Sequence, residues 1–162
     1  MKGDIWSIVR RGDTTRLARV IVEQKGSSNS IPLDHGLLHV AWQRNRPLIG
    51  WLLDQGISPD QRDSVGGTVL MYAAADDAIE TVVLLISRGA DVNARNDNGE
   101  TAFSYACAND SFRSAKRLHA AGAEVNTVDA GGGSPFDWAR CWASKKFYRW
   151  LIGIGCRGSP TA

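Results

Sequence analysis

The feature that most constrains this chain is a period of 33 residues. When the sequence is shifted against itself by this period, glycines, hydroxyl-bearing residues and apolar residues coincide without a gap. A fixed period of this size predicts a solenoid, in which each unit buries its apolar face against its neighbours. The clearest columns are Gly56, Gly89, Gly122 and Gly155; Gly66, Gly99 and Gly132; Thr68, Thr101 and Ser134; Ala73, Ala106 and Ala139; and Leu52, Leu85, Leu118 and Leu151.

Every unit repeats the same local signals. The hydroxyl residue is expected to cap a short first helix, because its oxygen accepts a hydrogen bond from the backbone N–H groups of the first turn. A second helix with apolar residues at helical spacing follows, and it ends at a glycine that can adopt the left-handed conformation. Residues 90–94 are expected to be extended and to lead into the next turn. The predicted units are roughly 1–29, 30–62, 63–95, 96–128 and 129–162, within a single domain over 1–162.

Residues 66–74 followed by 84–94 resemble an ankyrin repeat, and residues 98–103 with 121–126 match nearly as well. The resemblance is strong over 63–130, and it is weaker but in register over 30–62 and 131–155. Residues 4–26 look like a degenerate first unit. The resemblance implies an all-α ankyrin-repeat solenoid of stacked helix-turn-helix units with short β-hairpin-like loops, about five units in all.

In ankyrin arrays, as the resemblance implies, partners bind the concave side formed by the hairpin tips and the exposed edge of each first helix. Transferred by column, this places Trp42 and Trp142 on the surface at either end of a small, polar-to-acidic middle. Large aromatic side chains of this kind are typical binding anchors. The predicted partner-binding residues are Trp42, Gln43, Ser64, Val65, Tyr72, Asp76, Asp97, Asn98, Glu100, Tyr105, Asn109, Trp138 and Trp142.

Two groups of aromatic residues leave alternatives open. The column His39, Tyr72, Tyr105 and Trp138 is interpreted as a ladder between adjacent first helices, whose polar ends can still reach the concave surface. The last unit carries six aromatic residues within 136–150. They either cap the end of the array or form an exposed docking patch.

The charge is uneven along the array. Residues 64–97 carry two basic and five acidic side chains, whereas residues 131–162 carry five basic and one acidic. The acidic middle of the array points to a partner with a basic protrusion. The alternative is that these charges only keep the surface solvated and have no role in binding. The net charge of +2 is too small to indicate nucleic acid or an anionic membrane as the partner.

No group of residues indicates catalysis, a cofactor or a metal. His35 and His39 are four residues apart but lack the acidic residue of H-E-x-x-H. The glycines at 131–133 are not followed by the Lys-Ser/Thr of a phosphate loop. We therefore expect neither an enzyme nor a metalloprotein.

The expected compartment is the cytoplasm. No apolar run approaches the length of a membrane-spanning helix, and the apolar stretch near the start is too short for a secretory signal. Cys107, Cys141 and Cys156 form no C-x-x-C pair, and their odd number argues against a complete set of internal disulfides.

The leading functional hypothesis is a non-catalytic interaction module that is monomeric when free and binds one partner protein on its concave face. Such a compact array would inhibit or neutralise the partner by covering it, as bacterial toxin-neutralising immunity proteins of similar build do. The alternative is a structural adaptor that bridges two proteins.

Overall fold

The computed structural model describes residues 7–8, 11, 13–25, 41–42 and 46–159. In this part of the chain all regular elements are helices, apart from one isolated antiparallel bridge between Arg62 and Thr68. The helices are α2 (Thr14–Lys25), α4 (Leu48–Asp54), α5 (Val69–Ala75), α6 (Ile79–Ser87), α7 (Ala102–Ala108), α8 (Phe112–Ala120), α9 (Pro135–Trp142) and α10 (Lys145–Gly153).

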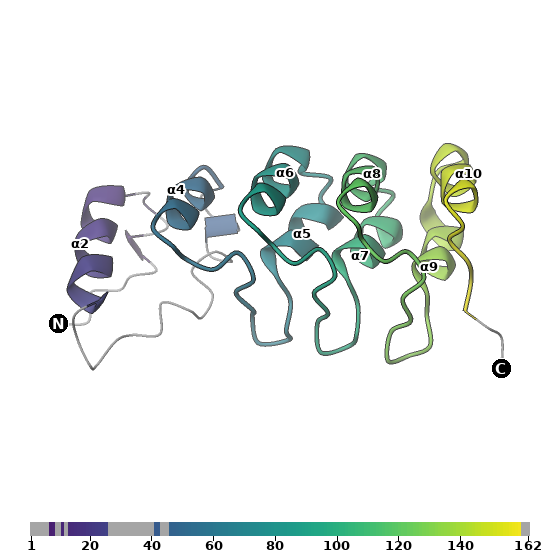
Figure 1. The fold of residues 1–162 in the computed structure, drawn as a ribbon, viewed down its shortest axis with the longest axis horizontal. Coiled ribbons are helices and arrows are strands. Elements are labelled where there is room, and N and C mark those ends of the chain that lie inside the picture. The colour runs from purple at the N-terminus through teal and green to yellow at the C-terminus, as the bar shows by residue number, and fades with distance from the viewer. Residues whose placement is uncertain (1–6, 9–10, 12, 26–40, 43–45, 160–162) are drawn as a thin grey trace.

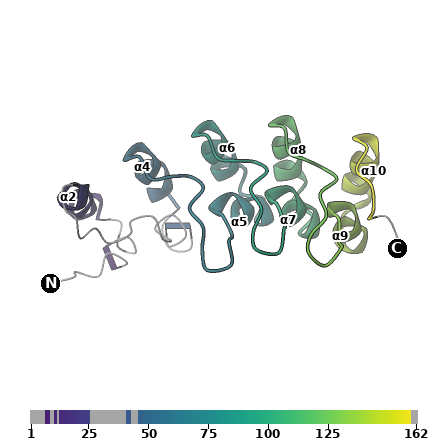
Figure 2. The same ribbon diagram turned by 60° about the horizontal axis from the view of Figure 1, so that its bottom comes forward.

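The helices form two parallel rows. The first helices α5, α7 and α9 lie in one row, and the second helices α4, α6, α8 and α10 lie in the other, with the loops projecting on the side of the first row (Figures 1 and 2). Helix α7 packs between α5 and α9, and α6 packs against α8. The predicted all-α solenoid is confirmed.

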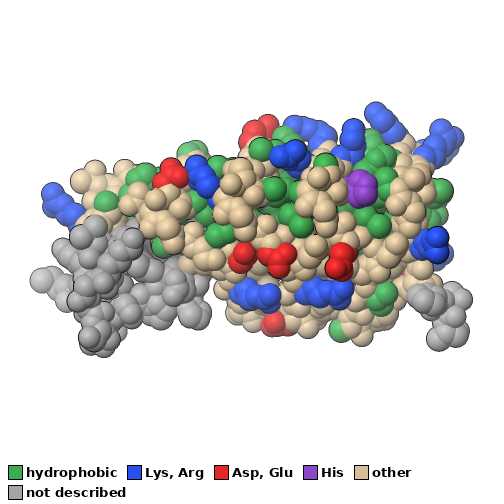
Figure 3. All heavy atoms as spheres, in the orientation of Figure 1, with side chains coloured by type: hydrophobic (Ala, Val, Ile, Leu, Met, Phe, Trp, Pro, Cys, Tyr) green, Lys and Arg blue, Asp and Glu red, His purple; other side chains and the backbone are tan. Residues whose placement is uncertain are grey.

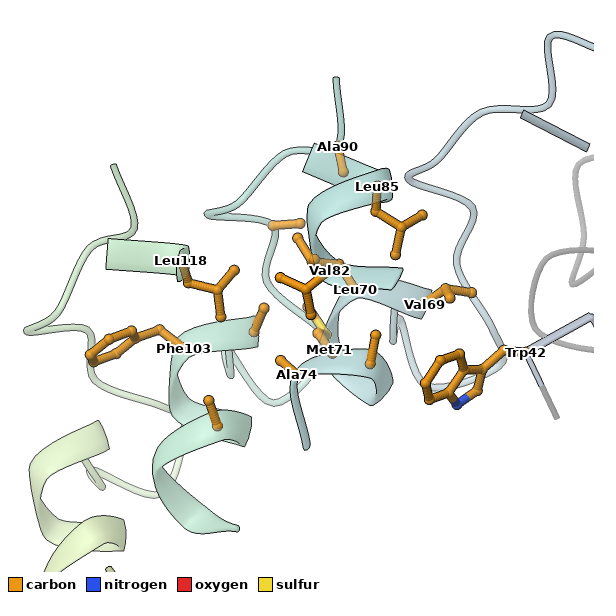
Figure 4. Close-up of a cluster of buried hydrophobic side chains, with 14 of the residues drawn as sticks. Trp42, Val69, Leu70, Met71, Ala74, Val82, Leu85, Ala90, Phe103 and Leu118 are labelled. Atoms are coloured by element: carbon orange, nitrogen blue, oxygen red, sulfur yellow. The ribbon is translucent and has the colours of Figure 1, made fainter. Parts of the chain in front are cut away.

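The repeated leucines form the centre of the stack. Leu52, Leu85, Leu118 and Leu151 are all fully buried, one in each second helix. The small residues Ala73, Ala106 and Ala139 are buried in the first helices, where their size lets adjacent helices approach closely. Full burial of a leucine side chain stabilises the fold by about 1.5–3 kcal/mol, so each member of this column contributes to the stability of its own unit. Figure 4 shows part of this core, with Leu85, Leu118 and Phe103 facing into it.

The residues predicted to start and to end the helices do so in the structure. Gly89 has φ of 83°, its N–H donates to the carbonyl of Ile86, and the N–H of Ala90 donates to that of Leu85. This is the hydrogen-bond pattern of a helix that ends in a left-handed residue. Thr101 and Ser134 accept from the N–H groups of Ser104 and Asp137, which confirms both as helix caps.

The prediction that residues 90–94 are extended is wrong. The N–H of Ala94 donates to the carbonyl of Asp91, which closes a turn. The cause is local, because the Asp91 carboxylate also accepts from the N–H of Asn93 at 2.9 Å. Aspartate commonly stabilises a turn by bonding the backbone two residues ahead.

Side chains in one column tie each unit to the next. Oδ1 of Asn93 accepts from the N–H of Glu124, and its Nδ2 donates to the carbonyl of Gly122. Asn126, one period later, makes the same pair of bonds to Arg157 and Gly155. These contacts hold the start of each loop against the helix-ending glycine of the following unit.

Candidate interaction surface

Three hairpin tips with the same backbone bonds lie side by side. In the first, the N–H of Asp63 donates to the carbonyl of Gly67. The same bond joins Asn96 to Glu100 and Asp129 to Gly133. We call the surface formed by tips 63–67, 96–100 and 129–133 and the exposed sides of α5, α7 and α9 the tip face (Figures 1 and 2).

The tips are rigidly connected. The N–H of Asp97 donates to the carbonyl of Val65 at 3.1 Å, and the N–H of Ala130 donates to that of Asn98 at 2.8 Å. Within each tip the first residue accepts two backbone N–H groups on Oδ1, as Asp63 does from Val65 and Gly67. The tip face is therefore organised before any partner arrives, which lowers the entropic cost of binding.

In each first helix, an aromatic side chain forms a hydrogen bond with the first residue of the preceding hairpin tip. The hydroxyl of Tyr72 donates to Oδ2 of Asp63, and Nε1 of Trp138 donates to Oδ2 of Asp129 at 3.1 Å. The hydroxyl of Tyr105 accepts from Nδ2 of Asn96 at 3.3 Å. Burial raises the pKa of both tyrosines, and the carboxylates of Asp63 and Glu100 raise them further.

The predicted aromatic ladder is confirmed for one pair of neighbouring residues, Tyr72 and Tyr105. The rings of Tyr72 and Tyr105 meet edge to face, with centroids 6.1 Å apart. Between Tyr105 and Trp138 the tip face is instead hollowed by a depression of about 280 Å³. His39, the first member of the predicted ladder, lies outside the described residues.

The depression brings together four of the predicted partner-binding residues. Tyr105 and Trp138 form aromatic walls, Glu100 contributes a carboxylate, and Asn109 lies at the end of α7. Nδ2 of Asn109 is held by the carbonyl of Tyr105 at 2.8 Å. Ala108, which the sequence places in the same exposed column as Trp42, and Ser104, which the sequence did not suggest, complete the lining.

The other predicted residues of the tip face are spread around this depression. Trp142 is 74% exposed and Val65 is 53% exposed, and both therefore offer apolar surface to solvent. Ser64, Asp76, Asp97 and Asn98 are exposed. Asp76 already pairs with the guanidinium of Arg46 at 2.8 Å.

The prediction that Trp42 is a surface anchor is wrong as to its position. Its side chain is only 7% exposed and lies beside Val69 at the edge of the core (Figure 4). The guanidinium of Arg46 covers the indole, 3.8 Å from the ring centroid, while it also binds Asp76. The indole thus gains both apolar burial and a cation–π contact. Gln43 lies outside the described residues.

The aromatic residues of the last unit divide into two groups. Phe147 is fully buried, and Trp150 packs against both it and Phe112, with ring centroids 6.0 and 5.6 Å apart. Phe136 stacks on Tyr148 at 4.9 Å. Trp138 and Trp142 remain exposed on α9. Four of the six aromatics therefore cap the array, and two are available for docking.

Among the described residues, no group of three or more His, Cys, Asp or Glu side chains could hold a metal ion. His35 and His39 lie outside this part of the chain. The helices that the structure describes include none long and apolar enough to cross a bilayer.

Stacked helix pairs joined by hairpin tips, with a continuous face of first helices, define a repeat solenoid of interaction modules. The family model for ankyrin repeats in three copies matches residues 8–96, 37–129 and 70–159, and this chain belongs to the ankyrin-repeat family. Ankyrin repeats generally mediate protein–protein interactions, and domains built from them are typically non-catalytic. A search of curated proteins finds no match to the chain.

Proposed function

We propose that this chain binds one partner protein on its tip face and inhibits or neutralises it by covering it, without catalysis. The observation that carries the proposal is the depression between Tyr105 and Trp138, beside the carboxylate of Glu100. Aromatic walls next to a carboxylate suit the side chain of a lysine or arginine, since both ring faces and the carboxylate attract a cation. The partner is therefore one that presents a basic protrusion.

The exposed residues around the depression support this proposal. Trp142 supplies a largely exposed aromatic side chain, and the tip that contains Glu100 adds the carboxylate of Asp97 and the amide of Asn98. A central pocket surrounded by apolar and polar contacts is the usual arrangement of a binding hot spot. We propose that the free chain is a monomer that acts in the cytoplasm, where its three free thiols are compatible with a reducing environment.

The test begins with capture of the partner from the source organism by the tagged chain, followed by mass spectrometry. Affinity is then measured by calorimetry for Trp138→Ala, Trp142→Ala and Glu100→Gln. We expect each tryptophan variant to weaken binding by about 2 kcal/mol or more, as truncation of an interface anchor does. Ile152→Ala is the matched control, because Ile152 is 56% exposed on α10, in the other row of helices.

Equal affinity of the three tip-face variants and the wild type would exclude the tip face as the binding surface. The inhibitory role is tested separately by adding the chain to the partner's own activity assay. Inhibition at one-to-one stoichiometry supports the proposal, whereas an unaffected activity together with a complex of three different components favours the adaptor.

A further inference from the structure

The last two second helices carry only positive charge. Helices α8 and α10 contain no aspartate or glutamate. Lys and Arg side chains accordingly gather along the edge of the molecule over these two helices (Figure 3). This edge belongs to the row of helices away from the tip face. The six cations are Arg113, Lys116, Arg117, Lys145, Lys146 and Arg149.

Four of these cations border a groove that runs from α6 across α8 to α10. The groove has a volume of about 470 Å³ and a partly apolar floor. We call it the basic groove and define it by its lining, which consists of Ile79, Phe112, Arg113, Lys116, Arg117, Ala120 and Lys146.

Two ammonium groups converge on one ring in this groove. Nζ of Lys116 lies 5.4 Å from the centroid of Phe112, and Nζ of Lys146 lies 5.7 Å from it. A cation–π contact at an exposed site is weak, so it holds each lysine near the ring without neutralising its charge. Phe112 is itself fixed by Phe147 and Trp150, at centroid distances of 5.1 and 5.6 Å.

These charges have little compensation within the described part of the chain. Its ion pairs include none with Lys116, Arg117 or Lys146. Arg113 reaches Glu80 only at 3.9 Å, and both side chains are largely exposed. An exposed pair at this distance contributes little to stability, so Arg113 can exchange Glu80 for another carboxylate at little cost.

We propose that the basic groove is a second docking site, which binds an acidic segment of a protein. Aspartate and glutamate side chains of this segment pair with Lys116, Lys146 and Arg117, and one apolar side chain between them lies on Phe112 and Ile79. Charge complementarity selects an acidic ligand, and the apolar floor favours a peptide over a phosphate chain. A long polyanion is further disfavoured by the acidic residues that follow in the same row, Glu80 on α6 and Asp54 on α4.

This proposal does not rest on the function proposed for the tip face. The two surfaces lie on different rows of helices, and each can be disrupted without altering the other. Occupation of both at once would place two proteins, or two segments of one protein, on opposite sides of the array.

The test uses the full chain and a fluorescein-labelled peptide of sequence Asp-Glu-Asp-Leu-Glu-Asp-Glu, with fluorescence anisotropy as the readout. We expect saturable binding that weakens with added salt, because ions screen exposed charges beyond about 10 Å at 0.1 M. Lys116→Glu with Lys146→Glu should weaken binding by about tenfold or more, since like charges then face each other. The peptide with Asn and Gln in place of its acids should not bind.

The matched control is Arg140→Glu with Arg157→Glu, which changes the net charge equally at exposed positions outside the lining and outside α8 and α10. This control should retain most of the affinity, and circular dichroism establishes that both variants are folded. The proposal is overturned if the control weakens binding as much as the groove variant, or if the acidic peptide does not bind. Tighter binding of a poly-dT oligonucleotide than of the peptide, lost in the groove variant, would overturn it in favour of nucleic acid.

Discussion

Nδ2 of Asn96 donates a hydrogen bond to Oε2 of Glu100 at 2.7 Å, at the middle one of three equivalent hairpin tips. The tips on either side have Asp63 with Gly67 and Asp129 with Gly133 at these two positions. Asn96 still accepts the N–H groups of Asn98 and Glu100 on Oδ1, as the aspartates do in their own tips. The amide of Asn96 therefore makes the same turn hydrogen bonds as an aspartate would, but it places no second negative charge beside Glu100.

This arrangement predicts that the two positions are coupled. Asn96→Asp alone should lower the free energy of unfolding by about 1–2 kcal/mol, because it replaces a hydrogen bond with two facing carboxylates. Asn96→Asp with Glu100→Gly should recover most of that loss, since it recreates the neighbouring tips. Urea unfolding of the two single variants and the double variant measures the coupling. Additive effects would contradict it.

Trp42 and Trp142 should differ in what their removal affects. Trp42→Ala is expected to destabilise the chain by about 3–5 kcal/mol, as loss of a buried aromatic side chain does. Trp142→Ala should change stability by less than about 0.5 kcal/mol, because its side chain is largely in solvent. Thermal and urea unfolding followed by circular dichroism distinguish the two, and similar losses would show that the burial of Trp42 is wrong.

The end of the array should be sensitive to acid through Asp137. Hydrogen bonds from the Ser134 hydroxyl, and then from the hydroxyl and N–H of Ser159, hold the pKa of this carboxyl well below its usual range. A folded-state pKa below the unfolded value of about 3.9 means that ionised Asp137 stabilises the fold above that pH and that this stabilisation is lost as the pH falls.

Asp137→Asn should therefore lower the urea midpoint at pH 7, and the difference from the wild type should shrink as the pH approaches 3. The effect should be modest, because solvent screens a partly exposed carboxylate. Ser159→Ala removes one donor and should raise the pH at which the difference disappears. A difference that stays constant from pH 7 to pH 3 would show that Asp137 acts through shape alone.

The three thiols should react in two classes. Cys141 is exposed, whereas Cys107 and Cys156 are buried. Burial raises the pKa of Cys156 to about 11 and that of Cys107 well above its ordinary value, so both stay protonated and unreactive. A colourimetric thiol reagent at pH 8 should modify one cysteine rapidly in the native chain and all three in urea. Rapid reaction of two or more in the native chain would contradict this burial.

Most of the frame could be predicted from the sequence, because it depends on local rules repeated at a fixed interval. The glycines that end the second helices need only their own backbone freedom, and the leucine column needs only helical spacing. The column that placed Trp42 on the surface fixes its backbone position but not the direction of a large ring. Ala75 and Ala108 occupy the same column with one methyl group each, so they gave no sign that Arg46 would cover an indole there.

The tip-face depression and the basic groove could not be predicted from the sequence, for different reasons. The depression arises where Glu100 replaces a column glycine and the aromatic ladder stops at Tyr105, which involves two columns at once. Within residues 98–130 the three cations of α8 are balanced by four acidic residues, so the charge of this unit gives no sign of a basic surface. The basic surface becomes apparent only in the helices themselves, because α8 and α10 contain cations and no acidic residue.

The bonds made by Asn93 and Asn126 reach only to the adjacent unit, and they do so with the same atoms. A block of 33 residues copied in tandem between them would find its donors and acceptors already in place at both junctions. Evolution, or an engineer, can therefore change the length of this array in whole-period steps by duplication or excision. The area offered to a partner then changes while the frame that presents it does not.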